Sequence, residues 1–164
     1  MARKHTTAPA GTLHVLEHDS KLLRGNPLGD PHVRKLGVWL PPQYESSPRK
    51  RFPVLYDLVG FTGSGLSHTG WKPFGDNVPE RAARLIYEKK MGPAIIVFPD
   101  CFTSLGGNQY INSSAIGNYA DYLTREIIPF VDREFRTLAS REHRGCFGKS
   151  SGGYGSIIQI GRAH

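Results

Sequence analysis

The chain has 164 residues, of which 38% are hydrophobic and 21% are charged, as is usual for a globular protein with one sizeable core. It contains no run of about 18 apolar residues, the length that a membrane-spanning helix needs, and no apolar run of signal-peptide length follows the basic residues 1–9. We therefore expect a cytoplasmic protein with no membrane partner.

The net charge of +7 raises the question of a nucleic-acid partner. The only dense basic run is PRKR at residues 48–51, which lies between turn residues and a predicted strand. Nucleic-acid patches are usually broader and interleaved with aromatic residues, so a solvated loop explains this run better and we expect no nucleic-acid partner. Cys101 and Cys146 have neither CxxC nor Cys/His spacing, which argues against a disulfide framework or a metal site, and Cys146 is assigned to core packing.

The first half of the chain is predicted to supply the centre of a sheet. Residues 1–10 have the composition of a flexible tail. Residues 12–17 and 33–40 alternate apolar and polar side chains, which predicts an antiparallel pair of half-buried strands. Residues 53–59 and 93–98 are nearly continuous apolar runs, which is the pattern of strands covered on both faces.

Helical patterns alternate with these strands. A helix is expected from Val78-Pro79 until Gly92 ends it, and apolar residues recur at helical spacing over 116–136, with a kink or break at Pro129. A short strand over 143–147 and a further helix follow. This order predicts an α/β protein in which a three-layer, mostly parallel sheet begins with antiparallel strands.

The segment RGCFGKSSGGYGS at residues 144–156 allows two interpretations. A phosphate-binding loop needs a glycine five residues before Gly148, where His143 stands instead. By contrast, GKSSG at residues 148–152 matches GxSxG, a tight strand-to-helix turn that holds its central serine in a strained conformation above the sheet. We therefore predict a nucleophile elbow, in which Gly148 and Gly152 allow the strand and helix backbones to approach closely; a glycine-rich surface turn is the alternative.

The elbow makes Ser150 the candidate nucleophile, which would require a histidine to accept its proton and an acid to orient that histidine. The N–H of Ser151, at the start of the following helix, is aimed where an oxyanion would develop. A second N–H donor is expected from the loop that follows residues 53–59.

From about residue 36 onward, the chain resembles the putative-esterase branch of the α/β-hydrolases, which includes S-formylglutathione hydrolase, ferric-enterobactin esterase, feruloyl esterases and mycolyltransferases. Five motifs in order carry the resemblance: VWLPPQY, FPVLYDLVGF, IIVFPD, YADYLTREIIPFVDREFRT and RGCFGKSSGGYGS. The resemblance implies a three-layer α/β-hydrolase sandwich and a serine carboxylic-ester hydrolase. It also implies a small-molecule ester substrate, no metal or organic cofactor, and a homo-oligomer as a possible assembly.

The resemblance also implies roles for particular residues. The second oxyanion donor is the backbone N–H of Phe61, although Val59-Gly60 replaces the His-Gly of many relatives. Lys149 stands where relatives often have His or Leu, and it either favours an anionic substrate or is simply solvated. The loops that contain Trp71, Asn108 and Tyr110 either contact the substrate or pack on themselves.

The catalytic triad of this fold runs serine, acid, histidine along the chain, but only fourteen residues follow Ser150 and none of them is acidic. The resemblance makes His164 part of a structural helix end. Of the upstream histidines only His68 lies in a loop that should face the site, and Asp100 is assigned a structural or substrate-facing role.

We therefore expect residues 11–164 to be the N-terminal part of a single α/β-hydrolase domain that lacks its C-terminal strands. Such a piece would leave the strand at 143–147 as an unpaired edge and would be inactive alone. The alternative is a non-catalytic binding or scaffolding module.

Overall fold

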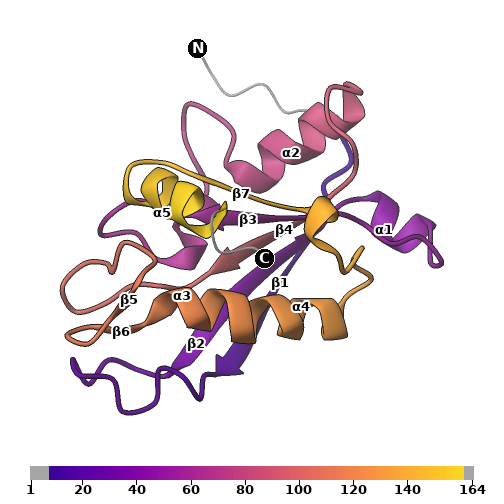
Figure 1. Cartoon of the computed structure of the whole chain (residues 1–164). Helices are drawn as coiled ribbons and strands as arrows, with labels where there is room; N and C mark the ends of the chain where they lie inside the picture. The colour runs from indigo at the N-terminus through magenta and orange to yellow at the C-terminus, as the bar shows by residue number, and fades with distance from the viewer. Residues whose placement is uncertain (1–7, 161–164) are drawn as a thin grey trace.

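The computed structural model describes residues 8–160, so most of the expected tail at residues 1–10 lies outside the described residues. A five-stranded mixed sheet with the strand order β1-β2-β4-β3-β7 forms the centre of the molecule (Figure 1). Its strands are β1 (Thr12–Asp19), β2 (Val33–Leu40), β3 (Val54–Leu58), β4 (Ile95–Pro99) and β7 (Arg144–Gly148).

The strand pairing confirms that the sheet begins with antiparallel strands. β1 pairs antiparallel with β2 and β2 pairs antiparallel with β4, whereas β3 runs parallel to both β4 and β7. All residues of β4 and most of β3 are buried, as their continuous apolar runs predict. β7 lies at the edge of the sheet, so its following turn opens beside the carboxyl end of β3.

Helices cover both faces of the sheet and complete a three-layer sandwich (Figure 1). Helix α2 (Val78–Tyr87) packs on one face, against a cluster built from Trp39, Ala82, Ala83, Ile86, Ile96 and Phe98. The opposite face carries α3 (Tyr119–Asp121), a π-helical segment (Tyr122–Ile127), α4 (Ile128–Glu134) and α5 (Ser151–Ile160). Because side chains alternate along a strand, Leu55 of β3 faces α2 while Tyr56 and Leu58 face the larger cluster on the other side.

Helix α2 begins as its sequence predicts but ends earlier. Asn77 and Glu80 form a reciprocal capping box at its start, in which each side chain accepts a hydrogen bond from the other residue's N–H. The predicted end at Gly92 is wrong, because the helix ends at Tyr87. Lys89 takes a left-handed conformation with φ of 58°, and a left-handed residue turns the chain out of a helix.

The helical pattern of residues 116–136 also needs correction. A short hairpin of β5 (Asn112–Ser113) and β6 (Gly117–Asn118) precedes the helix, which begins only at Tyr119. The helix continues past Pro129 to Glu134 without a break (Figure 1). The six residues before α4 wind as a wider π-helix, which makes room for a proline that cannot donate a hydrogen bond and would crowd the preceding turn.

The remaining short elements are α1 (Gln43–Ser46) and two 3₁₀ helices (Gly65–His68 and Arg141–His143). Within residues 8–160, no helix combines the length and the apolar character that crossing a bilayer requires.

Candidate functional site

The turn between β7 and α5 has the geometry of a nucleophile elbow. β7 ends at Gly148 and α5 begins at Ser151, so only two residues connect the strand to the helix. Ser150, the second of them, has φ of 55°, a left-handed conformation that costs a residue with a Cβ roughly 1–2 kcal/mol. Ser150 is exposed, and no side chain among residues 8–160 hydrogen-bonds its hydroxyl. The strained turn therefore presents an unengaged hydroxyl to solvent.

Two glycines allow this turn to sit against β3. A Cβ placed on Gly148 would lie 2.2 Å from the carbonyl oxygen of Leu58, and one on Gly152 would lie 1.7 Å from the same oxygen. Neither distance is sterically possible, since both contacts involve backbone. The spacing of the two glycines thus follows from the close approach of β3, β7 and α5. Ser150 lies between them, at the centre of the turn.

Two main-chain N–H groups remain free beside the turn. Within the described part of the chain, neither the N–H of Phe61 nor that of Ser151 has a hydrogen-bond partner, and both residues line one shallow pocket. Gly60 brings the first of them close to the elbow, because a Cβ on Gly60 would lie 3.6 Å from Cβ of Ser150. Thr62 anchors this loop through an N–H bond of 2.7 Å to the carbonyl of Gly106.

The pocket is lined by Val59, Gly60, Phe61, Gly63, Cys101, Gly106, Gly107, Asn108, Gln109, Tyr110 and Ser151. Two of the predicted substrate contacts, Asn108 and Tyr110, are buried in its wall. The Asn108 amide donates to the carbonyl of Cys101 and accepts the N–H of Tyr110, while the Tyr110 hydroxyl donates to the carbonyl of Val59 at 2.6 Å. Their polar groups hold the loop together, which favours the packing interpretation for both.

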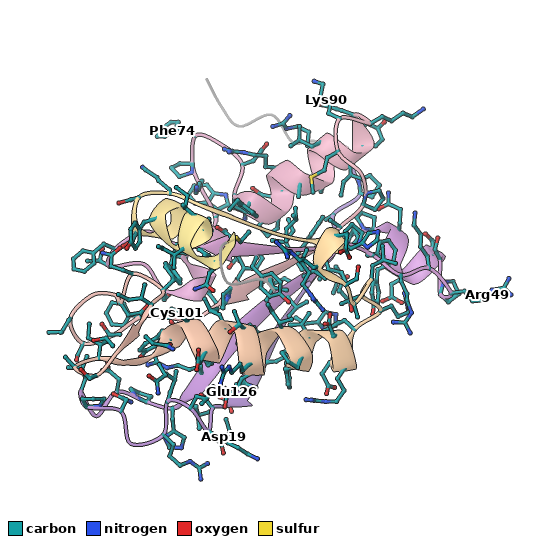
Figure 2. The ribbon with its side chains drawn as sticks, in the orientation of Figure 1. Asp19, Arg49, Phe74, Lys90, Cys101 and Glu126 are labelled. Atoms are coloured by element: carbon teal, nitrogen blue, oxygen red, sulfur yellow. The ribbon has the colours of Figure 1, made fainter. Side chains whose placement is uncertain are left out.

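Trp71 does not reach this pocket. Its side chain is 72% exposed, and it is absent from the lining residues. Phe74, in the same loop, is 90% exposed and projects from the edge of the molecule (Figure 2). The structure therefore does not bring Trp71 together with Asn108 and Tyr110.

Gln109 is a pocket residue that the sequence analysis missed. Its side-chain oxygen accepts a hydrogen bond of 2.7 Å from the hydroxyl of Ser151. The two residues lie 42 positions apart, and nothing in the local pattern GGNQYINS distinguishes this glutamine from its neighbours. Only the assembled fold brings the loop after β4 onto the first residue of α5.

Burial determines the chemistry of the other titratable groups in the pocket. Desolvation raises the pKa of the Cys101 thiol, and the nearby Asp100 carboxylate raises it further, so the thiol stays protonated and is a poor nucleophile. Figure 2 places Cys101 in the interior, between the sheet and the helical layer. Among residues 8–160, no three His, Cys, Asp or Glu side chains lie close enough together to share a metal ion.

His68 has a carboxylate partner rather than the serine. Its Nδ1 lies 2.7 Å from Oδ2 of Asp57, a fully buried residue on the α2 side of β3. Desolvation raises the pKa of Asp57, and the His68 hydrogen bond partly opposes that shift. This pair ties the 3₁₀ helix to the sheet.

The carboxylate of Asp100 contacts other parts of the fold. One of its oxygens accepts the N–H of Phe102, and the other lies 3.5 Å from the guanidinium of buried Arg34. That guanidinium also donates to the Tyr119 hydroxyl, so the end of β4 is joined to β2 and to the helical layer.

Comparisons with known proteins agree with this architecture. The family model described as "Putative esterase" matches residues 31–162. A ferulic acid esterase structure has 25% sequence identity and a TM-score of 0.76, covering 93% of this chain and 56% of that one. A ferulic acid esterase from Anaeromyces mucronatus has 22% identity and a TM-score of 0.69, covering 92% of this chain and 53% of its own.

An S-formylglutathione hydrolase from Agrobacterium tumefaciens is also similar in fold, with 20% identity, a TM-score of 0.67, and coverage of 97% of this chain and 56% of that protein. The chain thus spans a little over half the length of these solved structures. The family model covers well over half of the present chain, and the matched residues include the elbow. The chain belongs to this esterase family of the α/β-hydrolase superfamily.

Proposed function

We propose that the complete protein is a serine hydrolase of small-molecule carboxylic esters, with Ser150 as its nucleophile. One observation carries the proposal: Ser150 is exposed in a strained left-handed turn, with the free N–H groups of Phe61 and Ser151 beside it. Strain at one exposed serine is costly, and it is most easily explained where the conformation serves a chemical step.

The reaction that this arrangement supports is acyl transfer. The Ser150 oxygen bonds to the ester carbonyl carbon, the C=O electron pair moves onto oxygen, and the two N–H groups hold the resulting oxyanion. Collapse of that intermediate expels the alcohol, which takes up a proton, and leaves an acyl-enzyme. Water then adds to the acyl carbon, and the carboxylic acid departs as the Ser150 hydroxyl reforms.

The proton of Ser150 requires a base, and no histidine among residues 8–160 bonds its hydroxyl. His68 is held by Asp57 instead. We infer that an acid and a histidine outside the described residues complete the triad, which is consistent with coverage of only 56% of a similar esterase. Because no acidic residue follows Ser150 within the 164 residues, these residues alone should be inactive.

The test compares hydrolysis of p-nitrophenyl acetate by the complete protein and by its Ser150→Ala variant. Loss of the nucleophile should lower kcat by at least about 10⁴-fold. Ser114→Ala, at an exposed serine in the β5–β6 turn, is the matched control and should leave kcat unchanged. Turnover that survives Ser150→Ala would refute the proposed nucleophile, and rapid turnover by residues 1–164 alone would refute the need for an external base.

A further inference from the structure

The loop that carries Gln109 stores backbone strain next to the proposed oxyanion site. Gln109 and Tyr110 have φ values of 57° and 59°, so two successive non-glycine residues are left-handed. Each such residue costs of order 1–3 kcal/mol and persists only where the surrounding structure imposes it. The contacts of Tyr110 show what imposes it here.

Tyr110 is anchored from three sides. Its hydroxyl donates to the carbonyl of Val59, its N–H is bonded by the side chain of Asn108, and its carbonyl accepts a 2.7 Å bond from the Gln159 amide. Its ring packs so tightly on α5 that a Cβ on Gly155 would lie 2.4 Å from it. These contacts fix the backbone that precedes Tyr110, and they leave Gln109 as the exposed residue of the pair.

The strained backbone places the Gln109 amide on the elbow. Its oxygen accepts the Ser151 hydroxyl at 2.7 Å, while Ser151 itself is only 8% exposed. Ser151 is the first residue of α5, so a restraint on its side chain also restrains the backbone that carries its free N–H. The bond therefore connects the loop after β4 directly to one of the two proposed oxyanion donors.

We propose that Gln109 is a positioning residue that sets the direction of the Ser151 N–H for transition-state binding. This inference rests on the proposed function, because it assigns a role within the same oxyanion site. A hydrogen bond that aligns a donor stabilises the transition state more than the bound substrate, so its loss should appear in kcat rather than in KM.

The test is a double-mutant cycle in the complete protein with p-nitrophenyl acetate. Gln109→Ala removes the acceptor, and Ser151→Ala removes the hydroxyl but keeps the main-chain N–H. Each should lower kcat about 10-fold with KM changed less than about two-fold, and the double variant should be no slower than the single ones. Gln43→Ala, in α1 at the opposite end of the sheet, is the matched control and should have wild-type kinetics (Figure 1).

Amide hydrogen exchange supplies a readout that does not depend on turnover. The Gly152 N–H donates to the carbonyl of Lys149 at 2.9 Å within the turn, and it should exchange faster in Gln109→Ala and Ser151→Ala but not in Gln43→Ala. If the wild type turns over normally but the single variants keep its kcat, or if their effects add in the double variant, the positioning role of Gln109 is refuted and the proposed function is not. If the complete protein shows no Ser150-dependent turnover, the proposed function is refuted. In that case, Gly152 exchange that is unchanged in Gln109→Ala and Ser151→Ala would overturn the positioning role as well.

Discussion

Replacing Gly152 with alanine probes the close approach on which the elbow depends. The new Cβ would lie 1.7 Å from the Leu58 oxygen and 2.9 Å from the Val59 oxygen, whereas real Cβ contacts stay above 3.0 Å. Helix α5 must therefore move away from β3 by at least about 1 Å, because both obstacles are backbone atoms. Such overpacking costs about 1–3 kcal/mol of stability, and a shift of this size at a catalytic group costs about 10²-fold in rate.

Gly153→Ala is the matched control for this substitution. A Cβ on Gly153 would have Gly148 oxygen as its nearest contact at 3.5 Å, which is an ordinary van der Waals distance. Alanine in a helix is favoured over glycine by about 0.5–1 kcal/mol, so this variant should be at least as stable as the wild type. Urea denaturation and kcat for p-nitrophenyl acetate, measured on both variants of the complete protein, give the comparison. Equal effects of the two substitutions would refute the steric reasoning.

Three further substitutions test the surroundings of the site. Tyr110→Phe removes a buried 2.6 Å hydrogen bond and should cost about 1–2 kcal/mol in urea denaturation; unchanged stability would show that the bond contributes nothing. Thr62→Gly relieves a φ of 66° at a β-branched residue and should raise the melting temperature, whereas a lower one would contradict the strain. Burial raises the pKa of Asp57, and the hydrogen bond from His68 opposes this shift only in part. The protonated Asp57 carboxyl therefore favours the folded state, and this contribution to stability is complete below pH 3.8 and is lost as the pH rises through the raised pKa. Asp57→Asn should therefore gain stability relative to wild type as the pH rises above about 3.8, and a difference independent of pH would argue against the shift.

The burial of β3 and β4 inside the sheet and the position of the elbow could be predicted because local sequence indicates both. The continuous apolar runs of β3 and β4 require burial on both faces, and the two glycines of GxSxG are required by the close contact of the elbow with β3. The end of α2 could not be predicted in the same way. Lys89 has no sequence signal for a left-handed conformation, whereas the glycine at 92 has one.

The polar contacts around the site depend on tertiary structure and were not predictable. Asp57 and His68 come from different elements, and Gln109 meets Ser151 only because α5 packs beside the loop after β4. Pro129 shows the same limit for backbone geometry. A proline within a helical pattern predicts a kink or a break, but a π-helical segment before Pro129 accommodates the clash and the helix continues.

Covalent labelling of the complete protein with a fluorophosphonate tests the central claim most directly. The reagent phosphonylates a serine that is both activated and placed beside oxyanion donors. Peptide mass spectrometry should find the adduct on Ser150, within the peptide that contains GKSSG, and should find none in Ser150→Ala. An unlabelled protein, or an adduct on Ser151 or Ser156 that persists in Ser150→Ala, would contradict the assignment.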